Sequence, residues 1–579
     1  MPLTRFKLSA IEDGGIATVD LADGAVTTAK IADSAVTSIK TSALFTNTEI
    51  AGTEAARMPN GTTAQRANAA AGDIRFNSTI SLMEYYDGTT WKAIDSPPVA
   101  TSVSPTNFDT AGDTITVTGS NFQSGATVKL VAADAAQFSA SSVTFTNAST
   151  VSFDITAAMV ADNGDPYDVV ITNASGLAAT LSAALDFAPE PAWTVAAGTL
   201  GTIWDTQRTD AQTFTTGATS TESDATVTYA VTTGSLPSGL SIASSTGTIT
   251  GTTSAVGSDT TVTFTITATA TDSTSNTTTN TRQYSIVQKS ATVTSYTSTG
   301  SGTFSVPTGL TSVDVLVVAG GGTGGAANSP TGTDGGAGGG AGGLIYRPSF
   351  PVTPGGSISY TVGSGGTGSS YAWANQGPPN KGQDSVFGTL TSKGGGAGQS
   401  GPGDATTGGA SGAFQGGSGG GAGGGGGNGS VGGQATQPGR PGDSGTYGFG
   451  YPGGSNTNTP PYNGNGGGGA GGVGTVGSDG NGNPVPGGAG KTYSISGSSV
   501  GYAGGGGGGG GGPGAGNGGS GSSGGGTGKP SVDSAPLNGG AGSANRGGGG
   551  AGGAGVDSPR PWQTGVGGNG GSGIVIVKY

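Results

Sequence analysis

The side chains that could do chemistry in this sequence are almost all carboxylates. The 579 residues include no histidine and no cysteine. The commonest general base at neutral pH is therefore absent, as are the usual partner of a Ser nucleophile, thiolate metal sites and disulfides. Carboxylate-only chemistry, as in glycoside hydrolysis, stays open. Acids such as Asp13 and Asp23 recur within a short repeat, where acids set turns more readily than they catalyse hydrolysis.

Two kinds of glycine motif suggest phosphate binding but lack the elements that would position a phosphate. Gly-x-Gly-x-x-Gly matches occur throughout the C-terminal half by chance, and none lies in a strand–helix unit. Residues 487–492 read GGAGKT, yet the first glycine of a phosphate-binding loop falls at Val485 and no helix can follow in TYSISGS. We therefore predict that the chain is not an enzyme and has no cofactor and no metal site.

Composition narrows the class of protein further. Only 9% of residues are charged and the net charge is −13, whereas a nucleic-acid binder needs clustered Lys and Arg. We therefore expect no nucleic-acid partner. The β-branched content favours strands, and no stretch shows amphipathic helical periodicity. Because the chain is also too long for one core, we predict an all-β protein of several domains.

A ten-residue repeat occupies the N-terminal part of the chain. Its units begin at Ile11, Leu21 and Ile31, and each carries an aliphatic residue, Asp-Gly or Asp-Ser, and a second aliphatic residue. Such a unit cannot bury its own apolar side chains, so stacked repeats or several wound chains must bury them. We interpret residues 1–70 as an attachment arm. Three copies of the chain could wind their arms together as a homotrimer and so bury these apolar residues. A flexible low-complexity arm is the alternative.

Two N-terminal stretches resemble parts of phage proteins. LADGAVTTAKIADSAVTSIK, residues 21–40, resembles repeats in tail-fibre proteins of marine and cyanobacterial phages. GDIRFNSTISLMEYYDGTTWKAI, residues 72–94, resembles a small β module of phage fibre and tail proteins, with Asp87-Gly88 as a hairpin turn. The resemblance implies a fibre connector over residues 71–97, and any small β-hairpin is the alternative. Its apolar anchors would be Ile74, Phe76, Leu82, Tyr85 and Trp91.

Alternating strands and regularly spaced turns predict a β-sandwich over residues 98–190. The stretch contains Ser104-Pro105 and Gly119-Ser-Asn-Phe122 near its start, and Tyr167-Asp-Val-Val-Ile171 near its end. It resembles the IPT/TIG domain, which is Ig-like.

A second Ig-like sandwich is predicted over residues 191–290. Glycine and proline occupy turn positions in Leu236–Leu240 and Thr246–Gly251. In the long strand that follows, alternation places Val262, Phe264, Ile266 and Ala268 on one face. The stretch resembles the family called Putative Ig domain in bacterial and phage surface proteins. That resemblance implies a spacer, with carbohydrate binding as the rarer alternative.

The glycine-rich end, residues 291–579, could be a disordered linker, because glycine loses the most conformational freedom on ordering. Residues 301–579 hold 103 of the 124 glycines of the chain. However, apolar runs bracket it at 313–318 and 574–577, and an exposed C-terminal IVIV run would aggregate unless it paired. We predict that these two runs pair. The glycine runs between them would be extended threefold helices of the polyglycine II type, bonded sideways into an ordered lattice.

The glycine-rich stretch resembles the domain that closes many phage fibre and surface proteins. It is more loosely similar to the polyglycine-sandwich adhesins at the fibre tips of T-even-type phages, whose loops bind outer-membrane proteins or glycans. The resemblance implies that ring-bearing loops are receptor-binding candidates. That these rings only cap the lattice is the alternative. The candidates are Tyr371, Trp373, Asn375, Tyr447, Phe449, Tyr451, Tyr462, Arg560 and Trp562.

These features together predict a structural virion protein, a phage tail fibre or fibre-tip adhesin that recognises the host surface. Its partners would be other tail or baseplate proteins through the N-terminal arm, and a host surface protein or glycan through the C-terminal domain. The N-terminus lacks the apolar run of a signal peptide, and no segment is apolar enough to span a membrane. A capsid decoration or head fibre, a cellular surface adhesin and a polysaccharide-degrading tailspike are the alternatives.

Overall fold

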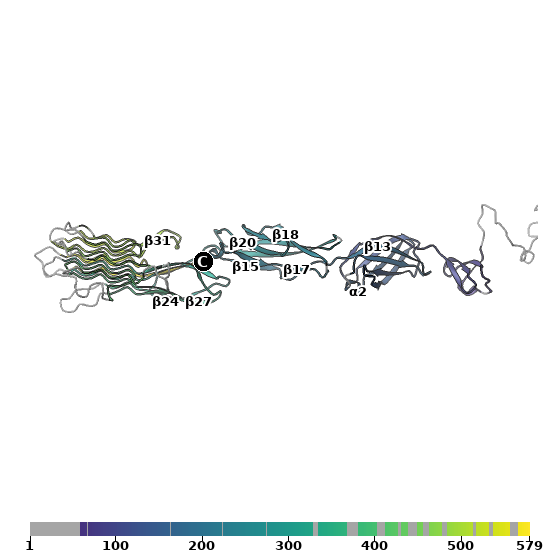
Figure 1. Ribbon diagram of the computed structural model, residues 1–579, viewed down its shortest axis with the longest axis horizontal. Coiled ribbons are helices and arrows are strands. Elements are labelled where there is room, and N and C mark those ends of the chain that lie inside the picture. The colour runs from purple at the N-terminus through teal and green to yellow at the C-terminus, as the bar shows by residue number, and fades with distance from the viewer. Residues whose placement is uncertain are drawn as a thin grey trace, which may run out of the picture. The chain divides into compact units, whose positions relative to one another are not determined.

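In the computed structural model, the regular secondary structure is almost entirely β-strand (Figure 1). The structure describes residues 58–66, 68–161, 164–222, 224–273, 275–327, 334–367, 380–401, 412–425, 430–437, 448–455, 462–477, 483, 485–512, 517–531, 537–555 and 565–579. The ten-residue repeat lies outside these residues, and the attachment arm stays a prediction. In the described part, no helix is long and apolar enough to cross a membrane.

Backbone contacts divide the chain into two compact units. One unit comprises Met1–Pro105, Thr114–Thr156 and Tyr167–Ala184, and the other comprises Thr106–Asp113, Ala157–Pro166 and Leu185–Tyr579. The predicted all-β class with two Ig-like sandwiches is confirmed, since α2 (Ala157–Val160) is the one α-helix within the described ranges.

The N-terminal module is a small sheet with strand order β1-β2-β3-β4. Its elements are β1 (Asn60–Gly61), the 3-10 helix η4 (Thr63–Gln65), β2 (Ile74–Asn77), β3 (Leu82–Tyr86) and β4 (Trp91–Ile94). The predicted hairpin is present between β3 and β4, where Asp87 Oδ1 accepts hydrogen bonds from the N–H groups of Thr89 and Thr90. Gly88 adopts a φ of +95°, which suits glycine.

The first sandwich consists of a four-stranded sheet, β10-β11-β7-β5, and a five-stranded sheet, β6-β13-β12-β8-β9. Its strands are β5 (Val99–Ser104), β6 (Asn107–Phe108), β7 (Thr114–Ser120), β8 (Thr127–Val131), β9 (Gln137–Ser139), β10 (Ser141–Asn147), β11 (Thr150–Asp154), β12 (Tyr167–Thr172) and β13 (Ala178–Phe187). Alternate side chains of the central strands are buried, as period-two strands require. They are Ile115, Val117, Val128, Leu130, Val151, Phe153, Val169 and Ile171.

The second sandwich has sheets β15-β22-β21-β18 and β16-β20-β19, with β14 and β17 as a separate pair. Its elements are β14 (Ala192–Trp193), β15 (Gly198–Ile203), η5 (Asp205–Gln207), β16 (Gln212–Thr215), β17 (Ala218–Thr219), β18 (Thr226–Gly234), β19 (Leu240–Ile242), β20 (Thr248–Gly251), β21 (Thr260–Thr271) and β22 (Thr277–Gln288). Phe264, Ile266 and Ala268 of β21 are buried on one face, as predicted. Gly239 is at φ +92°, and a Cβ there would lie 2.1 Å from the carbonyl oxygen of Thr252.

The second sandwich packs on the base of the glycine-rich domain. The ring centroids of Trp204 and Tyr579 are 5.6 Å apart, and Lys578 Nζ lies 3.0 Å from Asp205 Oδ2. Thr206 Oγ1 also donates a hydrogen bond of 2.9 Å to the Ser312 carbonyl. Trp204 belongs to the same apolar cluster as Val315, Val317 and Val575 of the glycine-rich domain. The sandwich therefore supports the glycine-rich domain through a shared core.

Two sheets form the base of the glycine-rich domain, in the orders β23-β33-β25-β26-β30 and β24-β27-β28-β29, beside the hairpin β31-β32. The strands are β23 (Val293–Tyr296), β24 (Gly300–Ser305), β25 (Ser312–Val318), β26 (Leu344–Pro351), β27 (Ser357–Val362), β28 (Ser385–Phe387), β29 (Leu390–Ser392), β30 (Gly448–Phe449), β31 (Lys491–Tyr493), β32 (Val500–Tyr502) and β33 (Ile574–Lys578). The predicted pairing of the two apolar runs is confirmed. β25 and β33 are antiparallel, with Val317 opposite Val575.

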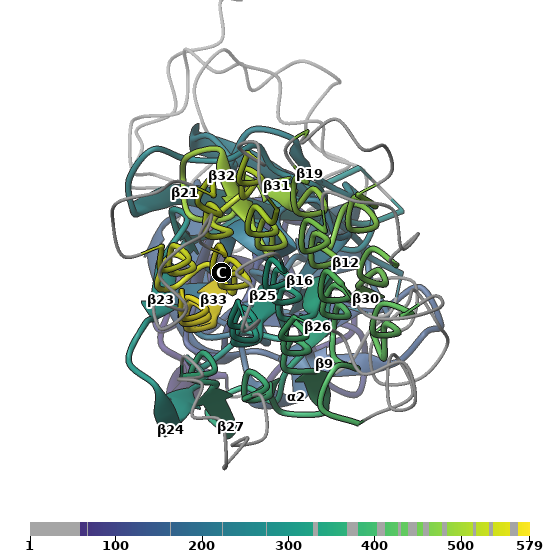
Figure 2. The ribbon, with the colours of Figure 1, turned by 90° about the vertical axis from the view of Figure 1, so that its left-hand side faces the viewer.

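Beyond these strands, the glycine runs bond to one another with a period of three residues. Along the run 319–327, every third N–H donates to the same neighbouring run. Gly321, Gly324 and Ala327 donate to Gly571, Gly568 and Gly565, while Ala319, Gly322 and Gly325 donate to Gly343, Gly340 and Ala337. Figure 2, viewed along the runs, shows them as triangles. A chain with three residues per turn gives both the triangular outline and this bonding.

An interior run bonds to neighbours on all sides. The run 335–343 donates hydrogen bonds to the runs 393–399, 462–468 and 547–553, and accepts them from the runs 319–325, 418–424 and 506–509. Such close approach leaves no room for most side chains. A Cβ at Gly338 would lie 1.9 Å from the Gly506 carbonyl oxygen, and one at Gly324 would lie 1.8 Å from that of Ala551. Glycine is therefore required here because backbones touch.

Candidate functional site

The outer edge of the glycine lattice exposes apolar side chains on neighbouring runs. Tyr451 is 39% exposed, and Val431, Val473 and Val476 are 50%, 60% and 39% exposed. The runs that carry them are adjacent, because Gly453 N donates to the Gly433 carbonyl and Gly474 N donates to the Pro452 carbonyl, both at 3.0 Å. We call these four side chains the outer face. Side chains of this size do not fit where neighbouring runs touch backbone to backbone, as at Gly324 and Gly338.

The structure describes only some of the predicted receptor-binding residues. Tyr451 is exposed on the outer face, and Tyr462 is half-buried, with its carbonyl accepting a hydrogen bond of 2.9 Å from Gly335 N. The remaining predicted residues, Phe449 apart, lie outside the described residues and stay predictions. They are Tyr371, Trp373, Asn375, Tyr447, Arg560 and Trp562.

Phe449 occupies a packed position in β30. The strand pairs with β26, with Phe449 opposite Leu344, and the ring packs against a buried cluster that includes Leu316 and Ile576. Lys491 Nζ lies 4.0 Å from the centre of the ring, a cation–π distance. These contacts hold the ring on the domain, so among the described candidates Tyr451 is the more accessible aromatic side chain.

The three valines of the outer face are functional candidates that sequence reasoning missed. A single valine among glycines looks like a spacer, because neither helical nor strand periodicity marks it. The available signal was that a valine side chain does not fit where neighbouring runs touch backbone to backbone. Scattered exposed apolar residues are ordinary, but here four lie on adjacent runs, which makes them candidates for contact with a protein or sugar partner.

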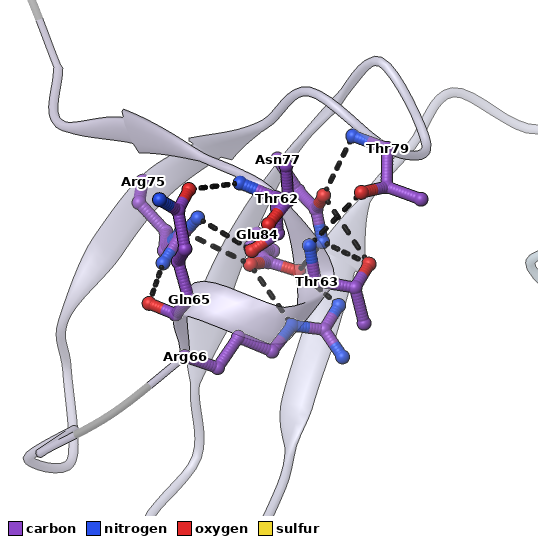
Figure 3. Close-up of polar contacts among 8 residues, drawn as sticks. All are labelled: Thr62, Thr63, Gln65, Arg66, Arg75, Asn77, Thr79 and Glu84. Carbon is purple, nitrogen blue, oxygen red and sulfur yellow. Dashed lines mark hydrogen bonds and ion pairs between the residues drawn. The ribbon is translucent and has the colours of Figure 1, made fainter.

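A second feature is the buried polar network of the N-terminal module (Figure 3). Glu84 is fully buried on β3 and opposite Arg75 of β2. Its carboxylate accepts hydrogen bonds from Arg66 Nε at 3.1 Å and from Asn77 Nδ2 at 2.9 Å, and a second contact from Arg66 Nη2. Arg75 Nε lies 3.3 Å from Glu84 Oε1. Among the described residues of this module, Asn77 and Glu84 are the fully buried side chains, and both are polar.

This network stabilises the ionised form of Glu84. Burial alone would raise its pKa, but hydrogen bonds from Arg66 and Asn77, with the charges of Arg66 and Arg75, outweigh burial and keep the pKa below its usual value. Glu84 is therefore ionised at neutral pH, between two arginines. A carboxylate with this many donors has a structural role in joining β2, β3 and the loop before them.

Apart from Lys92, which is paired opposite Tyr85, the opposite face of the same sheet carries apolar side chains that are at least partly exposed. Ile74, Tyr85 and Ile94 are 42%, 40% and 47% exposed, and Phe76 and Met83 are half-buried. Cross-strand pairing places Ile74 opposite Tyr85, and Met83 opposite both Phe76 and Ile94. The predicted anchors Ile74 and Tyr85 are therefore not core residues of the isolated module, because its buried face is taken by the polar network. We call these five side chains the apolar face.

Three segments of the chain match known protein families. Residues 294–579 match the Glycine-rich domain, residues 197–286 match the Putative Ig domain, and residues 98–188 match the IPT/TIG domain. The three resemblances inferred from the sequence are thereby confirmed. No curated protein matches the chain at a significant level.

Solved structures resemble the chain only in part. The Ig1-2 module of Drosophila receptor protein tyrosine phosphatase DLAR has 14% identity and a TM-score of 0.13, covering 34% of this chain and 100% of its own. Murine CEACAM1b has 10% identity and a TM-score of 0.18, covering 33% and 99%. Human CDH23 EC21-23 has 11% identity and a TM-score of 0.19, covering 46% and 95%. At such scores the matches carry no argument about function.

The fold and the family matches together define a class of protein. Two Ig-like domains are followed by a glycine-rich domain of the adhesin type, whose outer face presents apolar side chains. This combination fits a surface-binding or adhesion protein.

Proposed function

We propose that this chain is a structural protein of a phage particle, a tail fibre or fibre tip that recognises the host surface. The observation that carries the proposal is the laterally bonded lattice of glycine runs, because it supplies a body whose runs are held together by backbone hydrogen bonds. We assign these runs to polyglycine II helices, which the three-residue period supports. The resemblance of residues 21–40 and 72–94 to tail-fibre segments supports a place in such a particle.

Binding would occur through shape and many weak contacts. The outer face and the ring-bearing loops offer aromatic and aliphatic groups, which suit a host surface protein or the apolar faces of sugars. Several copies on one particle would raise the avidity of contacts that are individually weak. The two sandwiches would act as spacers, and the N-terminal arm would attach the chain to other tail or baseplate proteins.

The adsorption of virions tests this proposal. In one variant the segments 371–376 and 447–451, which include Tyr451, are replaced by Gly-Ser, and in another Val473 and Val476 become Thr. Each is expected to lower the adsorption rate constant by about tenfold or more, since a single interface anchor contributes that much. Val99→Thr, an exposed valine in the first sandwich, is the matched control. Adsorption by either variant at the rate of the unchanged virion would contradict host binding by this domain.

We also propose that the N-terminal module joins copies of this chain into a homotrimer. A module of about 40 residues without cysteine, and with no buried apolar side chain among its described residues, usually needs oligomerisation to be stable, and the apolar face provides the surface. The ten-residue repeats immediately before it have the same need to bury apolar residues. A second copy of the chain therefore covers the apolar face.

Mutation of the apolar face tests the oligomer. Ile74→Thr combined with Ile94→Thr keeps β-branched residues in the strands and removes apolar area, so we expect the mass from light scattering to fall from a multiple of 54.7 kDa to one chain. Val473→Thr, which changes an exposed β-branched residue in the glycine-rich domain, should leave the mass unchanged. A purified unchanged chain that is monomeric at micromolar concentration would exclude this role.

A further inference from the structure

A groove lies where two strands of the glycine-rich domain meet its glycine runs. β27 continues into the run 363–366, and the run 380–383 leads into β28. The two runs lie side by side, because Gln383 N donates a hydrogen bond of 2.9 Å to the Ser364 carbonyl. They also touch backbone to backbone, since a Cβ at Gly363 would lie 2.1 Å from the Gln383 carbonyl oxygen. The groove is therefore formed by main chain that neighbouring bonds hold in place.

The groove has a volume of about 770 Å³, which falls within the range of about 300–1,000 Å³ usual for small-molecule sites. Val362 and Val386 are its apolar lining residues, and none of the described lining side chains is aromatic. The other side chains that line it are polar, and glycines complete the walls. The polar residues are Thr299, Thr361, Ser364, Lys381, Gln383 and Asp384. We call this site the polar groove.

Lys381 brings an unpaired positive charge to the polar groove. Asp384 is the other charged residue in the described lining, and its Oδ2 lies 3.0 Å from Lys393 Nζ. The charge of Asp384 is therefore already matched. Lys381 is half-buried, and no described residue forms an ion pair or a hydrogen bond with its ammonium group. A local positive charge on a chain with a net charge of −13 attracts anions to this groove.

Free hydrogen-bond donors line the same groove. In the described part of the chain, the N–H groups of Ser364 and Lys381 donate to no acceptor, whereas the N–H of Gln383 bonds to a neighbouring run. The side chains of Thr299, Ser364 and Gln383 are exposed, and no described residue bonds to them. Ammonium, amide and hydroxyl donors are the groups that bind an anion and its polar neighbours. The charge and the donors therefore indicate an anionic, polar ligand independently of each other.

We propose that the polar groove binds an acidic saccharide, whose anionic group pairs with Lys381. The hydroxyl groups of the sugar would bond to Thr299, Ser364 and Gln383, which offer hydroxyl and amide partners. The role of the groove in host recognition rests on the proposed function, and the inference narrows the host ligand to acidic glycans. Other residues line the groove than form the outer face, so the two sites can be tested separately.

The composition of the lining favours a saccharide over other anions. An acidic protein partner usually docks with aromatic or large apolar anchors, and no such side chain is in the described lining. A nucleic acid needs clustered Lys and Arg, whereas Lys381 is the one unpaired cation of the described lining. A carboxylate or a sulfate on the sugar would meet the same donors, so ligands that differ in this group identify it.

Titration calorimetry with the purified full chain tests the groove. The ligands are trigalacturonate, which carries carboxylates, sulfated maltotriose, and unmodified maltotriose as the neutral control. One saturable site should appear with an acidic ligand, and the tighter of the two identifies the anionic group. Added NaCl should weaken the binding, because salt screens exposed charges. Failure of both acidic ligands to bind, or equally tight binding of maltotriose, would overturn the proposal.

Charge variants should shift the affinity in opposite directions. Lys381→Gln removes the unpaired cation, so the Kd of the tighter ligand should rise about tenfold or more. Asp384→Asn removes the negative charge of the lining and frees Lys393, so the Kd should fall. Lys529→Gln makes the same charge change at an exposed lysine elsewhere in the domain and should leave the Kd unchanged. Equal effects of the two lysine variants would show that binding follows net charge and would refute the site.

The titrations and the virion adsorption test can fail independently of each other. If the outer-face variants adsorb normally while Lys381→Gln loses saccharide binding, host binding by the outer face is wrong and the groove stands. If adsorption depends on the outer face but neither acidic ligand binds, the groove is wrong and the proposed function stands.

Discussion

Replacing Gly324 with alanine is expected to destabilise the glycine-rich domain by about 3 kcal/mol or more, because the overpacking involves main chain on both sides. The added Cβ would lie 1.8 Å from the Ala551 carbonyl oxygen and 2.3 Å from its carbonyl carbon. No rotation of a side chain relieves this contact. The run would have to move away from Gly568, whose carbonyl accepts the N–H of Gly324 at 2.9 Å.

Gly472→Ala is the matched control for this change. A Cβ at Gly472 would meet nothing closer than Ala489 N at 3.7 Å, an ordinary contact. We expect this variant to be neutral or slightly stabilised, since alanine lowers the entropy of the unfolded chain. Comparing the two variants separates the effect of close backbone packing from the general effect of replacing a glycine with alanine.

Hydrogen exchange of residues 320–573 measures the difference. In the unchanged protein and in Gly472→Ala, the amides of described residues in this range whose N–H groups are bonded between runs should exchange slowly. In Gly324→Ala they should exchange many times faster. Equal protection in both variants would show that the runs do not pack as closely as these distances require.

Glu84→Ala is expected to unfold the N-terminal module. Removing one partner of a buried ion pair costs about 3–5 kcal/mol, because the other charge stays buried without compensation. Here two arginines, Arg66 and Arg75, would lose their shared carboxylate. A module whose described residues form no buried apolar core has little else to hold it together. The two sandwiches have separate cores, so their unfolding should be unchanged.

Lys92→Ala is the control for charge in the same sheet. The Lys92 side chain is 55% exposed and 3.9 Å from Asp87, so its loss should cost less than about 1 kcal/mol. Exchange protection of residues 74–94 reports the module alone. If Glu84→Ala kept that protection, the polar network would not be what stabilises the module.

Acid should have the same effect as Glu84→Ala on the unchanged module. Because the folded pKa of Glu84 lies below 4.5, the stability from its ionised form is present above pH 4.5 and is lost as pH falls through the folded pKa. Glu84→Gln, which cannot ionise, should show no such acid transition.

The sequence alone predicted the elements that depend on local patterns. Alternation and turn residues indicated both sandwiches, and Asp87-Gly88 indicated the hairpin of the N-terminal module. The pairing of residues 313–318 with 574–577 was also predictable, although the two runs lie at opposite ends of the domain sequence. An exposed IVIV strand would be an aggregation hazard, so it needed a partner. The lack of histidine and cysteine narrowed the possible chemistry through composition alone. Each of these inferences depends on composition or on neighbours along the chain.

Which side chains are exposed and which are buried could be decided only from the tertiary structure. Tyr451 and Phe449 have similar sequence surroundings, yet one is exposed and the other packs against a buried cluster, because only Phe449 lies in a strand paired with β26. The sequence marked Ile74 and Tyr85 as apolar anchors of the module. The structure leaves both side chains exposed and buries Glu84 on the opposite face of the sheet. A hydrogen bond joins the side chains of Asn276 and Asp186, which are 90 positions apart in the sequence. Such contacts depend on which loops come together in the folded chain. The local pattern of apolar and polar residues does not predict this.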